Sequence, residues 1–158
     1  MKKLFFSLML LGLFCAFADT SFRFRMTDDG KGIYIDKYTG TDSIVYIAPY
    51  YNGLPVKGIG ASAFRYNKVV VEIQLPETVE WIGSSAFWDM YSLRKINFPA
   101  SLQSVGYEAF YGCRSLSQID FSYPIHTLSW SGNAFSACHS LPMNVQLTLI
   151  KMGYKDSF

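Results

Sequence analysis

The sequence is poor in the side chains that carry most catalytic and metal chemistry. Its 158 residues include only two histidines and three cysteines. His126 and His139 have no second histidine or carboxylate at metal-ligand spacing. Cys138 and His139 are adjacent, and neighbouring residues rarely face each other as nucleophile and base. Because no G-x-S-x-G, H-E-x-x-H or P-loop motif occurs either, we expect no enzymatic activity, no metal site and no cofactor.

Charge is also scarce, and the sequence has only one long hydrophobic run. Charged residues make up 16% of the chain and hydrophobic residues 50%, which excludes a disordered composition. The apolar run, residues 4–14, is too short to span a bilayer comfortably. It follows two lysines and precedes an Ala-Phe-Ala cleavage motif, so residues 1–18 are predicted to be a secretory signal peptide.

Removal of the signal peptide changes the charge balance. Without its two lysines, twelve basic residues remain against twelve acidic ones. A near-neutral chain is not expected to bind nucleic acid. The sequence therefore predicts an exported protein that is secreted, attached to the cell surface or periplasmic, with no transmembrane segment in the mature chain.

A repeat of 23 residues runs through the middle of the chain. The motif Ile-Gly-x-x-Ala-Phe begins at Ile59 and again at Ile82, and a variant begins at Val105. Seven apolar columns align across the three copies. They are Ile59/Ile82/Val105, Ala63/Ala86/Ala109, Phe64/Phe87/Phe110, Val70/Leu93/Leu116, Ile73/Ile96/Ile119, Leu75/Phe98/Phe121 and Val79/Leu102/Ile125. A unit of this length cannot bury a core alone, so the repeat predicts stacked coils in which each column forms a continuous apolar stripe.

A partial fourth unit follows the three copies. Its matching residues are Leu128, Ala134, Phe135 and Leu141. Because Phe135 follows Phe110 by 25 residues, we expect two inserted residues between Ser129 and Asn133.

Each full unit is predicted to contain one short parallel strand. The segments 70–75, 93–98 and 116–121 match the pattern L-x-x-L-x-L, and their last two apolar residues alternate with polar ones. Pro76 and Pro99 follow two of these segments, as expected of a residue that cannot donate to a strand ladder. The glycine before each Ala-Phe pair suggests a sharp turn, and the phenylalanine is expected to fill the coil.

The pattern I-G-x-x-A-F…C-x-x-L-x-x-I-x-x-P resembles the BspA-like leucine-rich repeats of bacterial surface and secreted proteins. Cys113 and Cys138 carry the cysteine of this motif, while Asn67 and Met90 replace it in the earlier units. The upstream segment YTGTDSIVYIAPYYNGLPVKGIG also resembles that family, so the resemblance covers roughly residues 30–141. It implies an α/β repeat fold, a right-handed leucine-rich-repeat solenoid with short parallel strands, and a role in protein binding or adhesion.

The ends of a solenoid need caps, because its core is otherwise open. We expect a signal peptide at 1–18, a β-rich N-terminal cap at 19–58, a solenoid at 59–141 with three full units and a partial fourth, and a C-terminal capping helix and tail at 142–158. Alternating apolar residues from Phe22 to Met26 and the turn at Asp28-Asp29-Gly30 predict a hairpin. A helix is predicted over about 142–152, because Ser140 can cap its start and Gly153 can end it.

Two motif matches have structural explanations. Residues 58–63 spell G-x-G-x-x-A, and Glu80 stands near the acidic position of a dinucleotide site. The later units keep only the second glycine and the alanine, as the repeat requires, so we assign no nucleotide site. Asp28-Asp29-Gly30 is similar to the start of a calcium loop but lacks the remaining ligands.

The two downstream cysteines occupy equivalent positions on successive coils. Stacking like that of strands would place the backbones of Cys113 and Cys138 about 4.8 Å apart, which a disulfide allows. Export makes oxidation feasible, but parallel side chains in a column tend to miss the required dihedral angle. We favour buried free thiols, with a disulfide as the alternative.

Two surfaces are candidates for binding a partner. The first is the face of the strands that points away from the core, which carries Glu72, Gln74, Lys95, Asn97, Gln118 and Asp120. The second is an aromatic ridge after the repeated phenylalanine, with Arg65, Trp88, Tyr91 and Tyr111, and Tyr107 nearby. A solvated sheet with a Glu72–Lys95 pair and a self-stacked ridge with Arg65 over Trp88 are the non-functional explanations.

We therefore expect a non-enzymatic binding module whose partner is a protein of a host or of the cell envelope, and which acts as a monomer. The alternative is a structural, self-assembling protein of the envelope. Of the two surfaces, we favour the strand face, since it presents side chains at regular spacing on the stiffest element.

Overall fold

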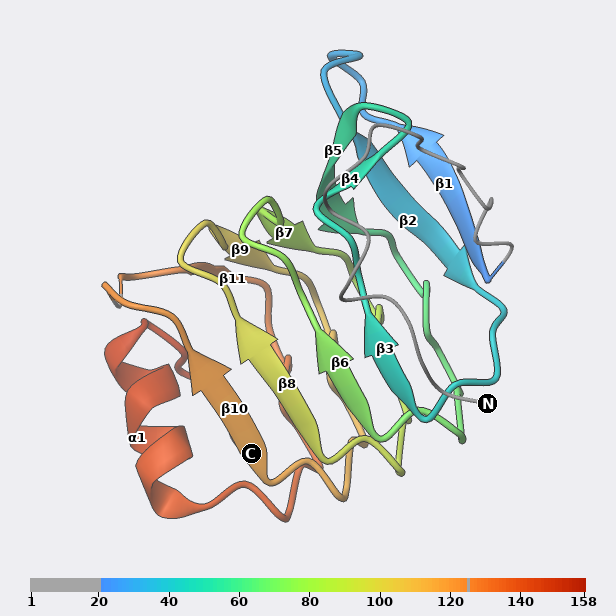
Figure 1. The fold of residues 1–158 in the computed structure, drawn as a ribbon. Helices are drawn as coiled ribbons and strands as arrows, with labels where there is room; N and C mark the ends of the chain where they lie inside the picture. The colour runs from blue at the N-terminus through green and yellow to red at the C-terminus, as the bar shows by residue number, and fades with distance from the viewer. Residues whose placement is uncertain (1–20, 125) are drawn as a thin grey trace.

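The computed structural model describes residues 21–124 and 126–158, so the predicted signal peptide and Ile125 lie outside the described residues. These described residues form short strands and one helix (Figure 1). The elements are β1 (Phe22–Met26), β2 (Ile33–Tyr38), β3 (Ile44–Tyr46), β4 (Tyr50–Tyr51), β5 (Leu54–Ile59), β6 (Glu72–Gln74), β7 (Trp81–Ile82), β8 (Lys95–Phe98), β9 (Ser104–Val105), β10 (Gln118–Phe121), β11 (Ser129–Trp130) and α1 (Met143–Lys151).

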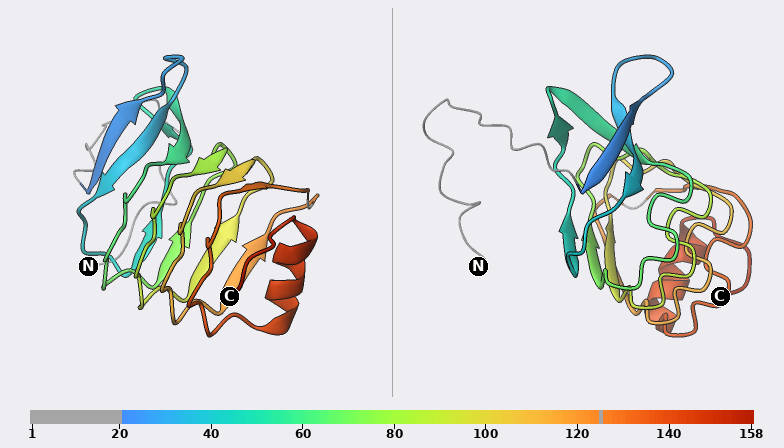
Figure 2. Two further views of the ribbon diagram at one scale, coloured as in Figure 1. Left: turned by 180° about the vertical axis from the view of Figure 1, so that it is seen from behind. Right: turned by 90° about the vertical axis from the view of Figure 1, so that its right-hand side faces the viewer.

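The strands build two sheets that run along the stack of coils (Figure 2). One sheet has the order β10-β8-β6-β3, and the other has the order β1-β2-β5-β7-β9-β11, with β4 paired to β5. Every pairing between successive coils is parallel, while β1–β2 and β4–β5 are antiparallel. The chain is therefore a parallel β-solenoid with a C-terminal helix, as predicted.

Each coil contains two strands where the sequence predicted one. The predicted strands are β6, β8 and β10, and the second set, β7, β9 and β11, contains only two residues per strand. β3, which precedes residue 59, and β5, which ends at residue 59, are also strands of these two sheets. The sheets therefore begin before the first full copy of the sequence repeat.

The core is a column of aromatic rings along the axis of the solenoid. Tyr38, Phe64, Phe87, Phe110 and Phe135 follow one another with centroids 4.9, 5.4, 5.0 and 4.9 Å apart. No polar or charged residue is buried in the described part of the chain. Burial of each ring should stabilise the fold by about 1.5–3 kcal/mol, which confirms the expected role of the repeated phenylalanine.

The glycine of the repeat motif allows neighbouring coils to approach closely. A Cβ on Gly83 would lie 2.7 Å from the backbone nitrogen of Ala61, and one on Gly106 would lie 2.5 Å from that of Ser84. The prediction that this glycine is needed for a sharp turn is wrong, because neither Gly83 nor Gly106 has a positive φ. The left-handed backbone conformations of the coil lie at other residues. They occur at residues such as Ser85 and Asp89, with φ of 54° at both.

The turns that contain these residues at positive φ are held by hydrogen bonds between coils. The N–H of Ser85 donates to Tyr107 O, that of Phe87 to Ala109 O, and that of Asp89 to Tyr111 O, at 2.7–2.9 Å. A non-glycine residue at positive φ costs roughly 1–3 kcal/mol when the surrounding structure enforces it. The turn ladder is such an enforcing structure, and it forms the side of the solenoid that neither sheet covers.

The insertion in the fourth unit lies earlier than predicted. Ser129 pairs with Ser104 and Trp130 with Val105, so the offset of 25 residues is already present at β11. The additional residues therefore precede Ser129, in the segment around the cis peptide bond between Tyr123 and Pro124. Trp130, rather than Leu128, lies opposite Val105 in this coil.

α1 closes the last coil at the C-terminal end (Figures 1 and 2). Val145, Leu149 and Met152 are buried, which confirms the predicted apolar face. The prediction that Ser140 caps the helix is wrong, because its hydroxyl donates to Arg114 O at 2.6 Å. The residue before the helix is Pro142, which has no side-chain capping bond. Gly153 follows the helix with φ of 96°, as the predicted stop requires.

The N-terminal end is covered by the β1–β2 hairpin. Phe24 lies opposite Ile35 and Met26 opposite Ile33, which confirms the predicted hairpin. At its tip the Thr27 hydroxyl and the Lys31 N–H donate to the Asp29 carboxylate at 2.6 and 3.0 Å. These bonds, the threonine bond first, lower the pKa of Asp29, so this acidic turn serves the hairpin.

Candidate binding surfaces

The outer face of the β3–β6–β8–β10 sheet presents the side chains that the sequence selected. We call Ile44, Tyr46, Glu72, Gln74, Lys95, Asn97, Gln118 and Asp120 the outer sheet face. Glu72 and Gln118 both pair in register with Lys95, and Asp120 pairs with Asn97. The six residues chosen from the sequence therefore form two continuous rows across three strands.

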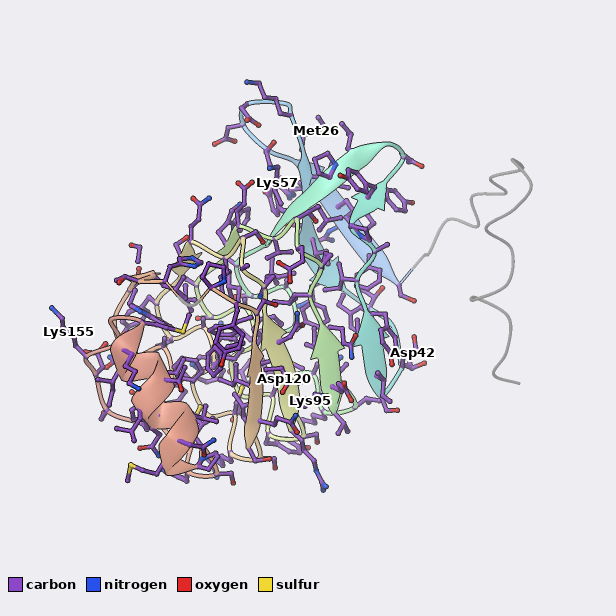
Figure 3. All side chains as sticks on the ribbon, turned by 60° about the vertical axis from the view of Figure 1, so that its left-hand side comes forward. Met26, Asp42, Lys57, Lys95, Asp120 and Lys155 are labelled. Atoms are coloured by element: carbon purple, nitrogen blue, oxygen red, sulfur yellow. The ribbon has the colours of Figure 1, made fainter. Side chains whose placement is uncertain are left out.

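An ion-pair network joins the charged residues of the outer sheet face. Lys95 Nζ lies 3.4 Å from Glu72 Oε1, which is the predicted pair, and 3.2 Å from Asp120 Oδ2 (Figure 3). The hydrogen bond and charge of Asp120, and then those of Glu72, raise the pKa of Lys95. Gln74 and Gln118 donate to the same two carboxylates at 3.1 and 2.8 Å. The face is thus a pre-arranged polar surface with a central cation.

Asn97 has a structural task in addition to its place on the outer sheet face. Its Nδ2 donates to Leu75 O at 2.8 Å, and its Oδ1 accepts from Leu75 N at 2.6 Å. This pair of bonds continues the ladder beyond the last residue of β6. Substitution of Asn97 would therefore disturb the sheet as well as the surface.

Two residues of the outer sheet face were missed by the sequence. Ile44 and Tyr46 lie in β3, opposite Glu72 and Gln74, and the two residues are 40% and 66% exposed. The strand has only three residues and no match at the 23-residue spacing, so periodicity gave no signal. They add an apolar and aromatic end to an otherwise polar face.

The aromatic ridge follows the turns on another side of the solenoid. The guanidinium carbon of Arg65 lies 4.4 Å from the Trp88 ring centroid, and Trp88 stacks on Tyr111 at 5.5 Å with an angle of 11° between the rings. Tyr66 meets the edge of Trp88 at 4.9 Å. The self-stacked arrangement expected as the non-functional explanation is therefore present. Tyr91 and Tyr107 are exposed, and Lys68 lies 5.8 Å from the Tyr91 ring.

The two downstream cysteines are free thiols in the structure. The thiol of Cys113 donates to Phe87 O and that of Cys138 to Phe110 O, each at 3.1 Å. Burial raises the pKa of Cys113 well above its usual value and that of Cys138 to about 12. Neutral, buried thiols are poor nucleophiles, so this pair stabilises the coil and is not a reactive centre.

His126 makes a contact with the backbone of the preceding coil. His126 Nε2 lies 2.6 Å from Leu102 O, a contact that ties a loop to the coil. Within residues 21–124 and 126–158, no cluster of three or more His, Cys, Asp or Glu side chains could hold a metal ion. The same residues contain no helix with the length and apolar character needed to cross a membrane.

Two hollows open near the N-terminal end. One, of about 380 Å³, is an open depression lined by Thr27, Asp28, Asp29, Lys31, Lys57, Glu80 and Trp81. The second, of about 70 Å³, is lined by Phe22, Phe24, Tyr46, Ile47, Ala48, Tyr51 and Val56. The second adjoins the outer sheet face, because Tyr46 belongs to both.

Solved structures of bacterial leucine-rich-repeat proteins are similar to this chain. A leucine-rich cell surface protein from Faecalibacterium prausnitzii A2-165 is 28% identical, with a TM-score of 0.67 over 82% of this chain and 37% of that one. A leucine-rich-repeat protein from Bacteroides capillosus is 21% identical, with a TM-score of 0.63 over 78% of this chain and 91% of that one. A third, from Bacteroides ovatus, is 23% identical, with a TM-score of 0.52 over 80% of this chain and 46% of that one.

The chain spans little more than a third of the Faecalibacterium protein, and the two Bacteroides proteins show the fold alone. A search of curated proteins found no significant match. The model of the BspA-type leucine-rich-repeat region matches residues 54–155 with six copies. This match covers most of the chain, and it agrees with the stacked coils and the aromatic column. The protein therefore belongs to the BspA-type leucine-rich-repeat family.

Proposed function

We propose that this protein is an exported binding protein that recognises a protein partner at the bacterial cell surface through its outer sheet face. The observation that carries the proposal is the arrangement around Lys95, where a cation and two carboxylates are held in fixed positions on neighbouring strands. Such a surface loses little side-chain freedom when a partner binds, which lowers the entropic cost of association. Its alternating charges favour specificity through charge pairing.

The proposed location rests on the family and on the N-terminal sequence. The Faecalibacterium relative is described as a cell surface protein, and residues 1–18 have the pattern of a secretory signal peptide. Export would place the outer sheet face where a host protein or an envelope protein can reach it. Adhesion is the role that this location and this surface support best.

The test compares two sets of substitutions in the mature protein, residues 19–158. The first set, Gln74→Ala, Gln118→Ala and Asp120→Ala, removes exposed polar groups from the outer sheet face. The second set, Trp88→Ala and Tyr111→Ala, alters the aromatic ridge by a comparable number of residues. Asn97 stays unchanged because its amide holds Leu75. Both proteins are first checked for folding by their melting curves.

Immobilised wild-type protein is exposed to envelope extracts and to purified extracellular-matrix proteins, and captured proteins are identified by mass spectrometry. The affinity for a captured partner is then measured for each variant. We expect the outer-face variant to lose about tenfold or more in affinity, as interface residues do when contacts worth about 1.4 kcal/mol or more are removed. If only the ridge variant loses the partner, the ridge is the site. If no partner is captured and the protein forms concentration-dependent oligomers, the self-assembling role replaces this proposal.

A further inference from the structure

β3 is the last strand of its sheet, at the end of the solenoid opposite α1 (Figure 1). Within residues 21–124 and 126–158, its strand partner is β6 alone. Ser43 O accepts from Glu72 N at 3.2 Å, and Ile47 N donates to Gln74 O at 3.1 Å. Residues 43 and 47 therefore direct their backbone groups toward β6, and so does Val45, because alternate residues of a parallel strand face the same neighbour.

Ile44 and Tyr46 must consequently direct their backbone groups to the other side. The ladder with β6 uses Ser43, Val45 and Ile47, and no other backbone hydrogen bond of residues 21–124 and 126–158 involves the N–H or C=O of Ile44 or Tyr46. Buried or half-buried backbone groups are almost always paired, and an edge with free groups is a template for another extended chain. The edge of β3 thus offers two donors and two acceptors in the spacing of a parallel strand.

The side chains at this edge are apolar and accessible. Ile44 and Tyr46 are among the exposed large hydrophobic residues of the protein, and Tyr50, in β4, is another at 60% exposure. Charged edge residues and prolines are the usual means by which proteins discourage strand addition. β3, with the sequence Ile-Val-Tyr, contains neither.

A hollow lies beside the end of the same edge. The 70 Å³ hollow is lined by Ile47 and Ala48, which follow β3, and by Phe22, Phe24 and Tyr51. Phe24 and Tyr51 stack at 4.3 Å and form part of its wall. A single ordered water needs only about 10–15 Å³ by the same measure, so the hollow has room for several water-sized groups, and we assign it to one apolar side chain. A strand added to β3 would direct the side chain opposite Ile47 toward this space, because Ile47 is itself buried.

We propose that the free edge of β3 receives an extended segment of the protein partner, which adds a strand to the sheet and places one large apolar side chain in the hollow between β1 and β4. In this mode the main-chain hydrogen bonds provide affinity and the hollow provides specificity. The inference rests on the proposed function in so far as the partner is a protein. It also defines the kind of segment that the partner presents.

A second copy of this chain fits the edge less well. Antiparallel pairing of two β3 strands that joins Ile44 to the partner copy's Tyr46 would place Ser43 of the second copy opposite Ile47. Serine is too small and polar to fill an apolar hollow, so the self-pairing leaves that space empty. A segment with a large hydrophobic residue three positions after the one opposite Ile44 satisfies both the edge and the hollow.

The chain supplies a suitable probe, a fluorescein-labelled peptide that copies residues 92–99, SLRKINFP. The register of the sheet places Ile44 opposite Glu72 and Glu72 opposite Lys95. A β8-like strand that adds to β3 in this register has its lysine opposite Ile44 and its phenylalanine opposite Ile47. The peptide has two charged side chains, those of Arg94 and Lys95, which keep it soluble.

Binding is measured by fluorescence anisotropy with the mature protein. Ile44→Pro removes a donor from the free edge without removing a bond to β6, and Ile44→Ser is the matched control that keeps the N–H. We expect saturable binding to the wild type and an affinity about five- to tenfold lower for Ile44→Pro than for Ile44→Ser. A peptide with alanine in place of its phenylalanine should bind about tenfold more weakly or worse.

Hydrogen exchange of the wild type with and without the peptide gives a second measurement that needs no variant. The amides of Ile44 and Tyr46 should become protected on binding. Absence of saturable binding at about 1 mM peptide, equal affinity of the proline and serine variants, or unchanged exchange at both amides would overturn the proposal. A dimer of the free protein that Ile44→Pro dissociates would show that a second copy is the occupant, which also contradicts it.

The outer-face variant with alanine at positions 74, 118 and 120 separates this proposal from the proposed function. It should bind the peptide as the wild type does, because its substitutions change neither the outward backbone groups of Ile44 and Tyr46 nor a residue that lines the hollow. Loss of the captured partner with retained peptide binding would support the outer sheet face. Loss of peptide binding in the Ile44→Pro variant alone would support the edge. Failure of either proposal is therefore visible without the other.

Discussion

The two ends of the solenoid cover the apolar core with different structures. At the C-terminal end, α1 and the tail cover the last coil, and Leu128 N and Trp130 Nε1 both donate to Met152 O at 2.9 Å. The Tyr154 hydroxyl accepts from Phe135 N at 3.1 Å and donates to Ser157 O at 2.9 Å. At the N-terminal end, the β1–β2 hairpin extends one sheet, while β3 ends the other with a free edge.

This difference shows how a cap can also prepare a surface for recognition. A helix satisfies its own backbone and needs only an apolar face to seal a core. A hairpin seals by pairing, so it protects only the sheet that it joins. β10 is the other terminal strand of the same sheet, and α1 lies beside it at the C-terminal end (Figure 1). Among the described residues no helix lies beside β3, so the N-terminal end is where we expect an extended chain to bind.

The largest loss of stability is expected for a substitution in the ring column, between the two ends. Phe87 is fully buried between Phe64 and Phe110 in the ring column. We expect Phe87→Ala to lower the free energy of unfolding by about 3–5 kcal/mol, measured by chemical denaturation with fluorescence detection. A free energy of unfolding equal to that of the wild type would contradict the stacked column.

The C-terminal cap should be the more sensitive of the two ends. Tyr154→Phe removes only a hydroxyl, yet it leaves the buried N–H of Phe135 without its acceptor, so we expect a loss of about 1–3 kcal/mol. Phe22→Ala removes a whole ring from the N-terminal hairpin but should cost only about 1 kcal/mol, since Phe22 is partly buried. Paired denaturation curves give the order, and a larger loss for Phe22→Ala would reverse our comparison of the caps.

The two buried thiols, Cys113 and Cys138, make the stability of the protein depend on pH. The pKa of Cys138 is raised from 9.0 to about 12, so the unfolded chain releases this proton before the folded one does. Stability is therefore fully present below pH 9 and falls as the pH rises, by about 1 kcal/mol per thiol between pH 9 and 10. Cys138→Ala should flatten this decline in denaturation measured under reducing conditions. The ionisation of tyrosine and lysine acts equally on both proteins.

Exchange of the thiols for hydroxyls is a matched test of the same two residues. Cys113→Ser and Cys138→Ser should each cost about 1–2 kcal/mol even with reductant present, because a hydroxyl replaces a small buried hydrophobe. If the variants are less stable than oxidised wild-type protein but as stable as reduced wild-type protein, a disulfide is present in solution and the free-thiol interpretation fails.

The coils could be predicted from the repeat, whereas residues outside its 23-residue spacing could not be assigned. Phe64, Phe87 and Phe110 are equally spaced, so their column could be derived from the sequence. Tyr38 and Tyr154 lie at other spacings from their neighbours and were not assigned to it. They are the residues that meet the column at its two ends.

The second sheet and the free edge were missed for a related reason. β7 and β9 have two residues each, and β3 has three, which is too few for alternation to indicate a strand. The outer sheet face, by contrast, followed from the alternation after each Ile of the repeat. Pairing between coils, a long-range property, decides where the short strands form.

The smallest effect on stability is expected at the free edge itself. Ile44→Pro should change the free energy of unfolding by no more than about 0.5–1 kcal/mol, because proline is tolerated where the N–H faces away from the sheet. Val45→Pro, its neighbour, removes a bond to β6 and should cost about 3 kcal/mol. Equal losses in the two melting curves would mean that both residues bond to β6.

Amide hydrogen exchange of the free protein tests the difference between the two ends most directly. At the C-terminal end, the amides of Leu128, Phe135 and Tyr154 donate to fixed acceptors and should exchange slowly, through opening of the fold. In β3, Ile47 should be protected by Gln74, while Ile44 and Tyr46 should exchange at nearly the rate of an unfolded peptide. Protection of Ile44 and Tyr46 comparable to that of Ile47 would show that the edge is already occupied and would contradict the account.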